Sequence, residues 1–322
     1  MHATGGATGV AGEEEPDRAA KARRRVGPYT LITALDDPRT KLPVPERRYI
    51  ARSADGQHTV LVSLPQQGSD PHRFLAEADG SRYLLGPCAA PARALAGPGE
   101  PAWYSRPYQP ALPLPTALAV HGGPLPERTV RTLGVALAET LAVLHGQGLT
   151  FAGVSPAAVL LAADGPRLSC FGAVRAAAPD GSSRSGLPGL EAGSLPPEQA
   201  SGGRPRPLGD VYALGATLAY AATGHTTPER DELPAAFRAV VARCLSRDPG
   251  SRPQLAELIG ALSAERDVET GAGDRSAALL TPGWLPGRVI AALAHQSAAV
   301  LTAEIPVEAT PAPPTRPLPQ PN

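Results

Sequence analysis

The spacing of apolar residues changes once along this chain, between residues 108 and 125, and the change limits the folds open to it. Before it, short apolar runs of strand length stand between turns, as in Thr30–Ala34, Arg48–Ala51 and Thr59–Leu64. Ala54-Asp55-Gly56 gives a turn signal between the last two runs. One helical stretch, Pro71–Leu85, lies among them. This part of the pattern predicts a small, β-rich unit.

After residue 125 the apolar residues recur every three or four positions, which is the period of an amphipathic helix. The longest such run consists of Val130, Leu133, Leu137, Leu141 and Leu144. Further runs of the same kind cover Val211–Leu218, Phe237–Leu245 and Leu255–Leu262. A small β-rich part followed by a larger helical part predicts an α+β fold with two lobes.

The two ends of the chain differ in composition from the middle. The sequence holds 38 Pro and 34 Gly, with 4% aromatic residues, a balance typical of a core that carries long loops or flexible ends. We expect disorder in residues 1–27 and in the Pro-rich tail, 304–322. Between them we assign the N-terminal lobe to 28–108, the helical lobe to 109–264 and a linker to 265–283.

Residues 284–303 form the last predicted element, an amphipathic helix that starts at Trp284. Most of its apolar residues fall on one face, namely Leu285, Val289, Leu293, Val300 and Leu301. A single amphipathic helix gains little stability in water unless its apolar face is covered. We therefore expect this helix to dock, either on the helical lobe of its own chain or on a second chain as an oligomer contact.

Charge and cysteine usage exclude several classes of function. The 30 basic and 30 acidic side chains cancel, so no overall field favours nucleic acid or an anionic membrane. Cys88, Cys170 and Cys244 are too far apart for a metal-ligand motif and fit reduced thiols in a cytosol. No apolar stretch reaches the ~20 residues of a membrane-spanning helix. We expect a cytoplasmic protein without a metal site.

Five motifs in the helical part carry a family resemblance. The first, Leu144–Leu161, contains Leu-His-Gly-Gln-Gly-Leu and then an apolar run. The second, Ala162–Gly172, ends in Cys-Phe-Gly. The others are Leu195-Pro-Pro-Glu-Gln199, Gly209-Asp-Val-Tyr-Ala-Leu-Gly215 and Cys244-Leu-Ser-Arg-Asp-Pro-Gly-Ser-Arg-Pro253. In order and spacing, these motifs resemble the catalytic loop, Asp-Phe-Gly and later motifs of bacterial, actinobacterial-type Ser/Thr protein kinases.

The resemblance covers residues 26–264, beginning at an opening strand, Val26–Leu31, that is similar to the family's first strand. It implies a bilobed, protein-kinase-like fold with a small β-rich N-lobe and a larger helical C-lobe.

The positions that the resemblance assigns to catalysis hold other residues. Phe151, Ala152 and Gly153 replace His-Arg-Asp, Ser155 and Ala158 replace the Lys and Asn of that loop, Cys170 replaces the Asp of Asp-Phe-Gly, and Ser63 replaces the third-strand Lys. The segment 35–48, where the glycine-rich loop belongs, contains no glycine. Glu77 aligns with the helical Glu that partners the third-strand Lys.

Residues with structural roles in the family are retained. The resemblance implies that Glu198 and Arg252 form a buried ion pair, which ties the activation segment to the helical lobe. It also implies that Asp210 holds the backbone of the catalytic loop. Phe171 is kept and Phe151 replaces a histidine, so two apolar positions stay filled. The sequence thus preserves support for the fold.

Phosphoryl transfer needs a metal, a positioned base and a cradle for the nucleotide. Cys170 and Ala158 are poor magnesium ligands, because magnesium prefers hard oxygen atoms. The segment 149–163 contains no ionisable side chain. We therefore expect a pseudokinase without catalytic residues or cofactor. It would act as a regulatory or scaffolding domain that binds a protein partner, such as a kinase or another enzyme.

Two alternatives stay open at this point. One is a weakly active or unorthodox Ser/Thr kinase that uses displaced carboxylates, for which Asp36, Asp37 and Asp164 are the candidates. The other is a module that binds a nucleotide such as ATP without magnesium.

Overall fold

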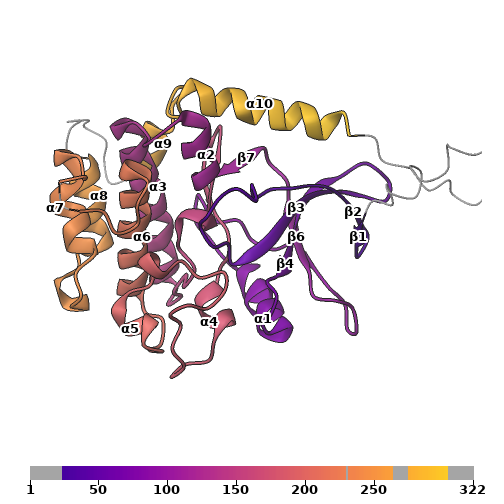
Figure 1. Ribbon diagram of the computed structural model, residues 1–322, viewed down its shortest axis with the longest axis horizontal. Coiled ribbons are helices and arrows are strands. Elements are labelled where there is room, and N and C mark those ends of the chain that lie inside the picture. The colour runs from indigo at the N-terminus through magenta and orange to yellow at the C-terminus, as the bar shows by residue number, and fades with distance from the viewer. Residues whose placement is uncertain (1–23, 230, 264–274, 304–322) are drawn as a thin grey trace, which may run out of the picture.

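The two lobes predicted from the apolar pattern are present as a sheet-rich part and a helical part (Figure 1). This division confirms the α+β, kinase-like fold class. The computed structural model describes residues 24–229, 231–263 and 275–303. Most of the two ends expected to be disordered, and the first half of the expected linker, lie outside the described residues.

The N-terminal lobe is a six-stranded antiparallel sheet with the strand order β1-β2-β3-β4-β6-β5. Its strands are β1 Arg25–Val26, β2 Tyr29–Ala34, β3 Glu46–Ser53, β4 Thr59–Pro65, β5 Ala94–Leu95 and β6 Tyr104–Pro107. One helix, α1 (Pro71–Ser81), packs beside the sheet, and the Asp70 side chain caps its first turn. The three strands expected from the sequence match β2, β3 and β4.

Two boundaries in this lobe differ from the expectation. Strand β1 lies inside the segment 1–27, because Gly27 turns the chain at a φ of 53° and Val26 then packs on the outer apolar cluster of the sheet. Helix α1 ends at Ser81 rather than at Leu85. There the chain leaves the helix so that Leu84 reaches the core of the helical lobe.

The period-two alternation of β3 and β4 gives the sheet two different faces. The outer face is apolar and includes Ala51, Val62 and Trp103. The inner face carries Arg48 opposite Ser63 and Ile50 opposite Leu61. Since Ile50 and Leu61 share an apolar cluster with residues of β8, the inner face is the one turned toward the helical lobe.

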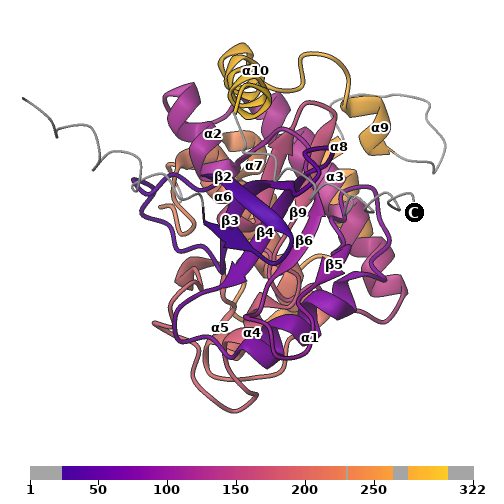
Figure 2. The ribbon, with the colours of Figure 1, turned by 90° about the vertical axis from the view of Figure 1, so that its right-hand side faces the viewer.

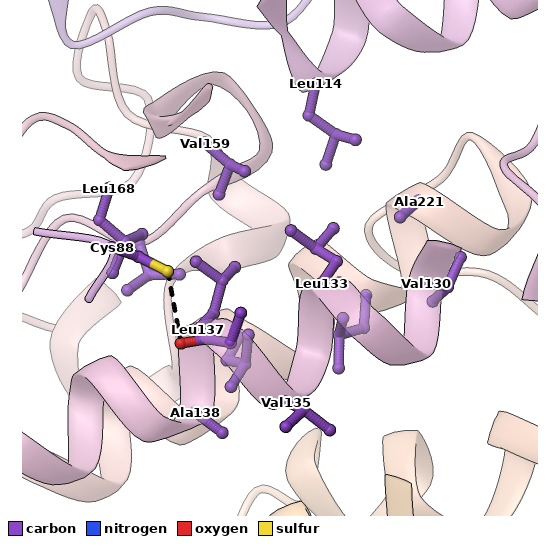
Figure 3. Close-up of a cluster of buried hydrophobic side chains, with 14 of the residues drawn as sticks. Cys88, Leu114, Val130, Leu133, Val135, Leu137, Ala138, Val159, Leu168 and Ala221 are labelled. Carbon is purple, nitrogen blue, oxygen red and sulfur yellow. Dashed lines mark hydrogen bonds between the residues drawn. The ribbon is translucent and has the colours of Figure 1, made fainter. Parts of the chain in front are cut away.

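The helical lobe is built around α3 (Glu127–Gly146), which packs against α6 (Pro207–Thr223) and α8 (Leu255–Ser263). Figure 3 shows the cluster of buried side chains around α3, where the Cys88 thiol also donates to the Ala136 carbonyl. Burying a Val or Leu side chain contributes about 1.5–3 kcal/mol. The predicted apolar run on α3 is completely buried, at Val130, Leu133, Leu137, Leu141 and Leu144.

The other elements of this lobe connect or cover that core. A second sheet has the order β7-β8-β9 and lies next to the N-terminal lobe. The elements are β7 Ala111–Pro113, α2 Leu114–His121, β8 Val159–Ala162, β9 Gly165–Leu168, α4 Ala173–Ala177, α5 Pro197–Ala200 and α7 Ala235–Cys244. Short 3₁₀ turns cover Pro156–Ala158, Ala192–Ser194 and Pro249–Ser251.

Two helices follow α8. The segment assigned as a linker, 265–283, contains α9 (Arg275–Leu279). The first two backbone amides of α9 donate hydrogen bonds to the Glu139 carboxylate of α3. Helix α10 (Gly287–Leu301) begins after Pro286 rather than at Trp284. It docks within the same chain, on α2, and extends over the N-terminal sheet (Figures 1 and 2). None of the helices in the described ranges has the length and apolar character needed to cross a bilayer.

A bidentate ion pair joins the activation-segment end of the helical lobe to its last turns. Arg252 Nη1 and Nη2 lie 2.6 and 2.9 Å from the two carboxylate oxygens of Glu198. The guanidinium also donates to the carbonyls of Ser246 and Leu208. The Arg252 side chain is fully buried, whereas 31% of the Glu198 side chain is exposed. The arginine is therefore the partner that would suffer most from losing its counter-ion.

Replacing Glu198 with Gln should lower the melting temperature at pH 7 by several degrees, because it leaves a buried guanidinium uncompensated. Burial opposes ionisation of Glu198, but hydrogen bonds from Arg252 hold its pKa below 4.5. A carboxyl with a lowered pKa stabilises the fold above its unfolded pKa, and that stability is lost as the pH falls through the folded value. The difference between Glu198→Gln and wild type should therefore shrink as the pH is lowered below 4.5.

The matched control is Glu257→Gln, which removes an ion pair to Arg243 in which both side chains are 51% exposed. Such surface pairs contribute about 0–1 kcal/mol. Thermal unfolding followed by circular dichroism at several pH values compares the two variants. Equal losses for both would contradict a special role for the Glu198–Arg252 pair.

Candidate functional site

The seam between the lobes contains most of the positions that the resemblance assigns to catalysis. Ser63 lies on the inner face of β4 and is completely buried. Ala158 ends the 3₁₀ turn that follows the loop at 149–155, and Cys170 follows β9. Both are also buried. The residues that surround these positions decide what chemistry the seam can perform.

The Arg48 guanidinium lies in this seam. Arg48 is the cross-strand neighbour of Ser63, and its side chain is fully buried. Nη1 donates to the Ser169 hydroxyl at 2.9 Å and lies 3.9 Å from the Cys170 sulfur. Nε and Nη2 form a bidentate ion pair with Asp36. Burial is the largest influence and works against the charged form, but the charge and hydrogen bonds of Asp36, together with the smaller effects of Cys170 and Glu46, outweigh it and raise the pKa of Arg48.

A second buried polar group lies beside it on the same face of the sheet. The Tyr104 hydroxyl donates to both carboxylate oxygens of Glu46, at 2.7 and 2.8 Å. Burial raises the pKa of Tyr104 well above 10, so the hydroxyl keeps its proton. Arg106 donates to the Tyr104 oxygen at 3.0 Å and to the Ser63 hydroxyl at 3.3 Å. Protein side chains thus bind the hydroxyls of Ser63 and Tyr104 and the Glu46 carboxylate, whereas the buried Nε of Arg106 has no hydrogen-bond partner.

Cys170 has an unusual backbone and an unreactive thiol. Its φ is 65°, in the left-handed region that non-glycine residues rarely adopt. Burial raises the pKa of its thiol to about 12. The sulfur therefore stays protonated at neutral pH, and a neutral thiol is a poor ligand for a hard cation.

The loop that resembles a catalytic loop is held by Asp210. Its carboxylate accepts from the backbone amides of Phe151 and Ala152, at 2.7 and 2.9 Å, and lies 3.0 Å from Nε2 of His145. Ala152 adopts a φ of 51°. The Phe151 and Phe171 rings meet edge to face with centroids 5.6 Å apart. These contacts keep the loop in one conformation.

Position 153 has no room for a side chain. A Cβ atom on Gly153 would lie 2.1 Å from the carbonyl oxygen of Cys170, far inside the 3.0 Å that real Cβ contacts respect. The Ser155 hydroxyl accepts a hydrogen bond from the backbone amide of Ala158. The Ala158 carbonyl accepts from the Ser169 hydroxyl at 2.7 Å. Gly153 and Ser155 therefore have structural roles, and the segment 149–163 presents neither an acid nor a base.

Glu77 does not contact Ser63 or Arg48. Its carboxylate instead binds Arg175 of α4 through two bonds of 2.8 and 2.7 Å. Arg175 also donates to the Thr150 carbonyl and lies over the Phe171 ring. The pair joins α1 to the segment after Cys-Phe-Gly, so Glu77 links the two lobes.

The three carboxylates proposed as displaced catalytic groups are each paired with an arginine. Asp36 binds Arg48, as described above. Asp37 binds Arg39, whose hydrogen bonds lower the pKa of Asp37 to about 2. Asp164 lies 2.7 Å from Arg167 in the β8–β9 turn.

A cavity of about 230 Å³ lies next to the connection between the lobes. Leu35 and Leu61 line it from the N-terminal lobe, and Leu160 lines it from β8. Arg93, Arg106 and Arg167 also contribute to its lining, and no carboxylate does. The cavity thus combines apolar walls with positive charge.

A further buried arginine organises the segment between Cys170 and α5. The Arg184 guanidinium is fully buried and donates to the carbonyls of Val174, Ala178, Gln199 and Gly203, with Asp180 as its counter-ion. This segment corresponds to the activation segment of the resemblance, and a protein cation fixes it.

Reasoning from the sequence identified Ser63, Gly153 and Cys170 but not the groups that fill the space around them. Arg48 follows Arg47 in β3, and Arg106 follows Ser105 in β6, so the apolar pattern of the sequence does not indicate that these two arginines are buried. The alternation of β3 offered one clue, because Arg48 shares its face with the apolar Ile50. Among the described residues, no group of three or more His, Cys, Asp or Glu side chains converges as a metal site would require.

Comparison with protein-family models gave no match. Comparison with curated proteins finds the probable serine/threonine-protein kinase PkwA of Thermomonospora curvata, 32% identical over an alignment of 262 residues that covers 75% of this chain and 34% of PkwA. Serine/threonine-protein kinase AfsK of Streptomyces coelicolor is 28% identical over an alignment of 292 residues that covers 83% of this chain and 35% of AfsK. PknK of Mycobacterium tuberculosis is 33% identical over an alignment of 187 residues that covers 51% of this chain and 16% of PknK.

The chain spans about a third of the length of PkwA and AfsK. These relatives, the five ordered motifs and the bilobed α+β fold agree with one another. The chain is a kinase-like homologue of the actinobacterial serine/threonine-protein kinases.

Proposed function

We propose that this chain is a pseudokinase, a kinase-like domain that transfers no phosphate and acts by binding a protein partner. The observation that carries the proposal is the buried guanidinium of Arg48, the cross-strand neighbour of Ser63, which contacts Ser169 and Cys170. In the family pattern, the position of Ser63 holds the phosphate-binding Lys, and the position of Cys170 holds the metal-binding Asp. A cation of the protein itself therefore occupies the space between them.

Magnesium and a nucleoside triphosphate fit these residues poorly. Magnesium prefers oxygen ligands in octahedral geometry. The two aligned positions offer a protonated thiol, with a pKa of about 12, and the methyl group of Ala158. The carboxylates beside these positions are already engaged, because Asp36 binds Arg48 with both oxygens and Glu46 accepts from the Tyr104 hydroxyl with both of its oxygens. We therefore derive no phosphoryl-transfer step at this site.

The same geometry argues against an unorthodox kinase. A general base is most effective when its pKa lies near the working pH. Asp37, with a pKa of about 2, is a very weak base, and its charge is engaged by Arg39. Asp164 is held by Arg167 in a turn of the second sheet. Gly153, at the position of the family's base, has no space for a side chain.

A partner-binding role is supported by a rigid frame with exposed apolar side chains. Arg184 and the Glu198–Arg252 pair fix the activation segment without any modification. Just after α1, Tyr83 and Leu85 are 74% and 60% exposed. Exposed large apolar groups that lie close together are typical of protein interaction sites. We propose this end of α1 as part of the partner surface.

A second candidate function is the binding of a small anionic ligand, such as a nucleotide, without magnesium. The cavity of about 230 Å³ favours it, because three arginines and apolar side chains line the same space. Ligand sites usually combine apolar walls with a few polar groups in this way. The arginines would take the place of a metal in balancing negative charge.

Purified protein incubated with labelled ATP and magnesium should incorporate no phosphate, either into itself or into generic protein substrates. The reason is that the seam holds neither a free base nor a magnesium ligand. An active Ser/Thr kinase assayed in parallel provides the control. Incorporation that disappears in Asp36→Asn, Asp37→Asn or Asp164→Asn would instead establish the unorthodox kinase.

Thermal-shift measurements with ATP, with and without magnesium, should show no stabilisation that depends on the metal. Stabilisation by ATP alone that is reduced in Arg167→Ala would support the second candidate function. A shift that requires magnesium would contradict both proposals, since it would mean that the seam assembles the family's metal site.

Replacing Gly153 with Ala should lower the melting temperature by several degrees, because the new methyl group must displace the Cys170 carbonyl. The matched control is Gly146→Ala, in the last turn of α3, where a Cβ atom would meet nothing within 4 Å. Alanine there should be neutral or stabilising, since it is the better helix former. A Gly153→Ala variant as stable as the control would show that the loop can move aside.

A further inference from the structure

Helix α10 lies outside the segment that carries the kinase-like motifs, and its contacts extend over both lobes (Figure 1). Its approach is fixed on the helical lobe by Trp284, which is 1% exposed. The Trp284 indole donates to the Ala163 carbonyl at 2.8 Å, and its carbonyl accepts from the Thr129 hydroxyl at 2.7 Å. Val289 and Leu293 then join the main core. The first half of the helix is thus part of the helical lobe.

The middle of α10 binds the segment that connects the lobes. This connection runs from the end of β6 at Pro107 to the start of β7 at Ala111. The Gln296 side chain donates to the Ala111 carbonyl at 3.1 Å and accepts from the Ala111 amide at 3.0 Å. It also accepts from the Tyr108 hydroxyl at 2.8 Å. Because β7 is an edge strand, this amide pairs with it as a further strand would.

The last turn of α10 reaches the N-terminal lobe. Val300 is 3% exposed and belongs to the apolar cluster that contains Leu35 and Leu61 of that lobe and Leu160 of β8. The Arg52 guanidinium of β3 donates to the Val300 carbonyl at 2.6 Å. A cation at this end of a helix satisfies a free carbonyl and opposes the helix dipole. The end of α10 is therefore held by the lobe opposite to the one that holds its start.

We infer that α10 is an intramolecular strap that holds the two lobes in one relative orientation. The buried residues that gather around Val300 include Leu35, Leu61, Ala111 and Leu160, which also line the cavity between the lobes, so the strap also controls access to that cavity. Release of α10 from Gln296 to its C-terminal end would free the connection at Ala111 and let the lobes turn apart. This inference goes beyond the proposed function, since it holds whether or not the seam transfers phosphate.

The strap is well suited to local release. Its contacts on the helical lobe come from several buried side chains, whereas its N-lobe contacts come from Val300 and from the Arg52 bond. Segments with few buried contacts open at lower free energy than the core. The C-terminal end should therefore detach while Trp284 and Val289 remain in place.

Val300→Asp tests the strap, with the neighbouring Leu301→Asp as its control, because Leu301 is 77% exposed. Hydrogen–deuterium exchange is measured on the full chain. In Val300→Asp we expect exchange about tenfold faster or more at the Ala111 amide and in β3, with α3 and α6 unchanged. Leu301→Asp should match wild type at all of these sites.

Gln296→Ala is a second, milder variant, paired with Arg288→Ala on the same helix, whose side chain donates to the His121 carbonyl of the helical lobe. Only Gln296→Ala should speed exchange at Ala111. Unchanged exchange in both Val300→Asp and Gln296→Ala would overturn the inference. So would equal acceleration in α3 and β3, because α10 would then be a general stabiliser of the fold.

Discussion

A positive charge buried between two lobes is the constraint on which this structure depends. The Arg48 side chain has no contact with solvent, so its ion pair with Asp36 and its bond to Ser169 must replace water. Removing one partner of such a pair typically costs about 3–5 kcal/mol. Asp36 therefore fixes the chain just after β2, and Ser169 fixes the N-terminal lobe onto the helical lobe. The closed arrangement of the seam follows from the need to satisfy one guanidinium.

Buried arginines that are satisfied by protein groups also occur elsewhere in the fold. Arg184 and Arg252 are also buried, and each donates to backbone carbonyls of segments that have little regular structure of their own. A guanidinium carries five donors in a rigid plane, so one side chain can tie several loops together. Irregular segments gain by this means the order that a sheet or helix would otherwise give them. The result is a frame in which buried arginines hold the irregular segments in place.

Much of the fold could be predicted from the sequence, because burial leaves short apolar runs in β2 and β4 and a periodic apolar pattern in α3. The short helix α9 left no such trace, since its first turn depends on a carboxylate from α3. For the site, motif order indicated which positions had changed, at Ser63, Gly153 and Cys170. What fills the space could not be predicted, because it depends on which face of β3 turns inward. Only the register opposite β4 places Arg48 beside Ser63.

The Gly153 backbone also bears on which side chains this loop could accept. A new side chain can be introduced by a single substitution only where the space that it needs is open. Here the Cys170 carbonyl occupies that space, and Cys170 itself adopts a left-handed conformation stabilised by the packing around it. An acidic residue at 153 would have to follow, rather than precede, a rearrangement of the neighbouring strand end. The order of mutational steps is thereby constrained, because the packing of one carbonyl must change before a side chain at position 153 can be accommodated.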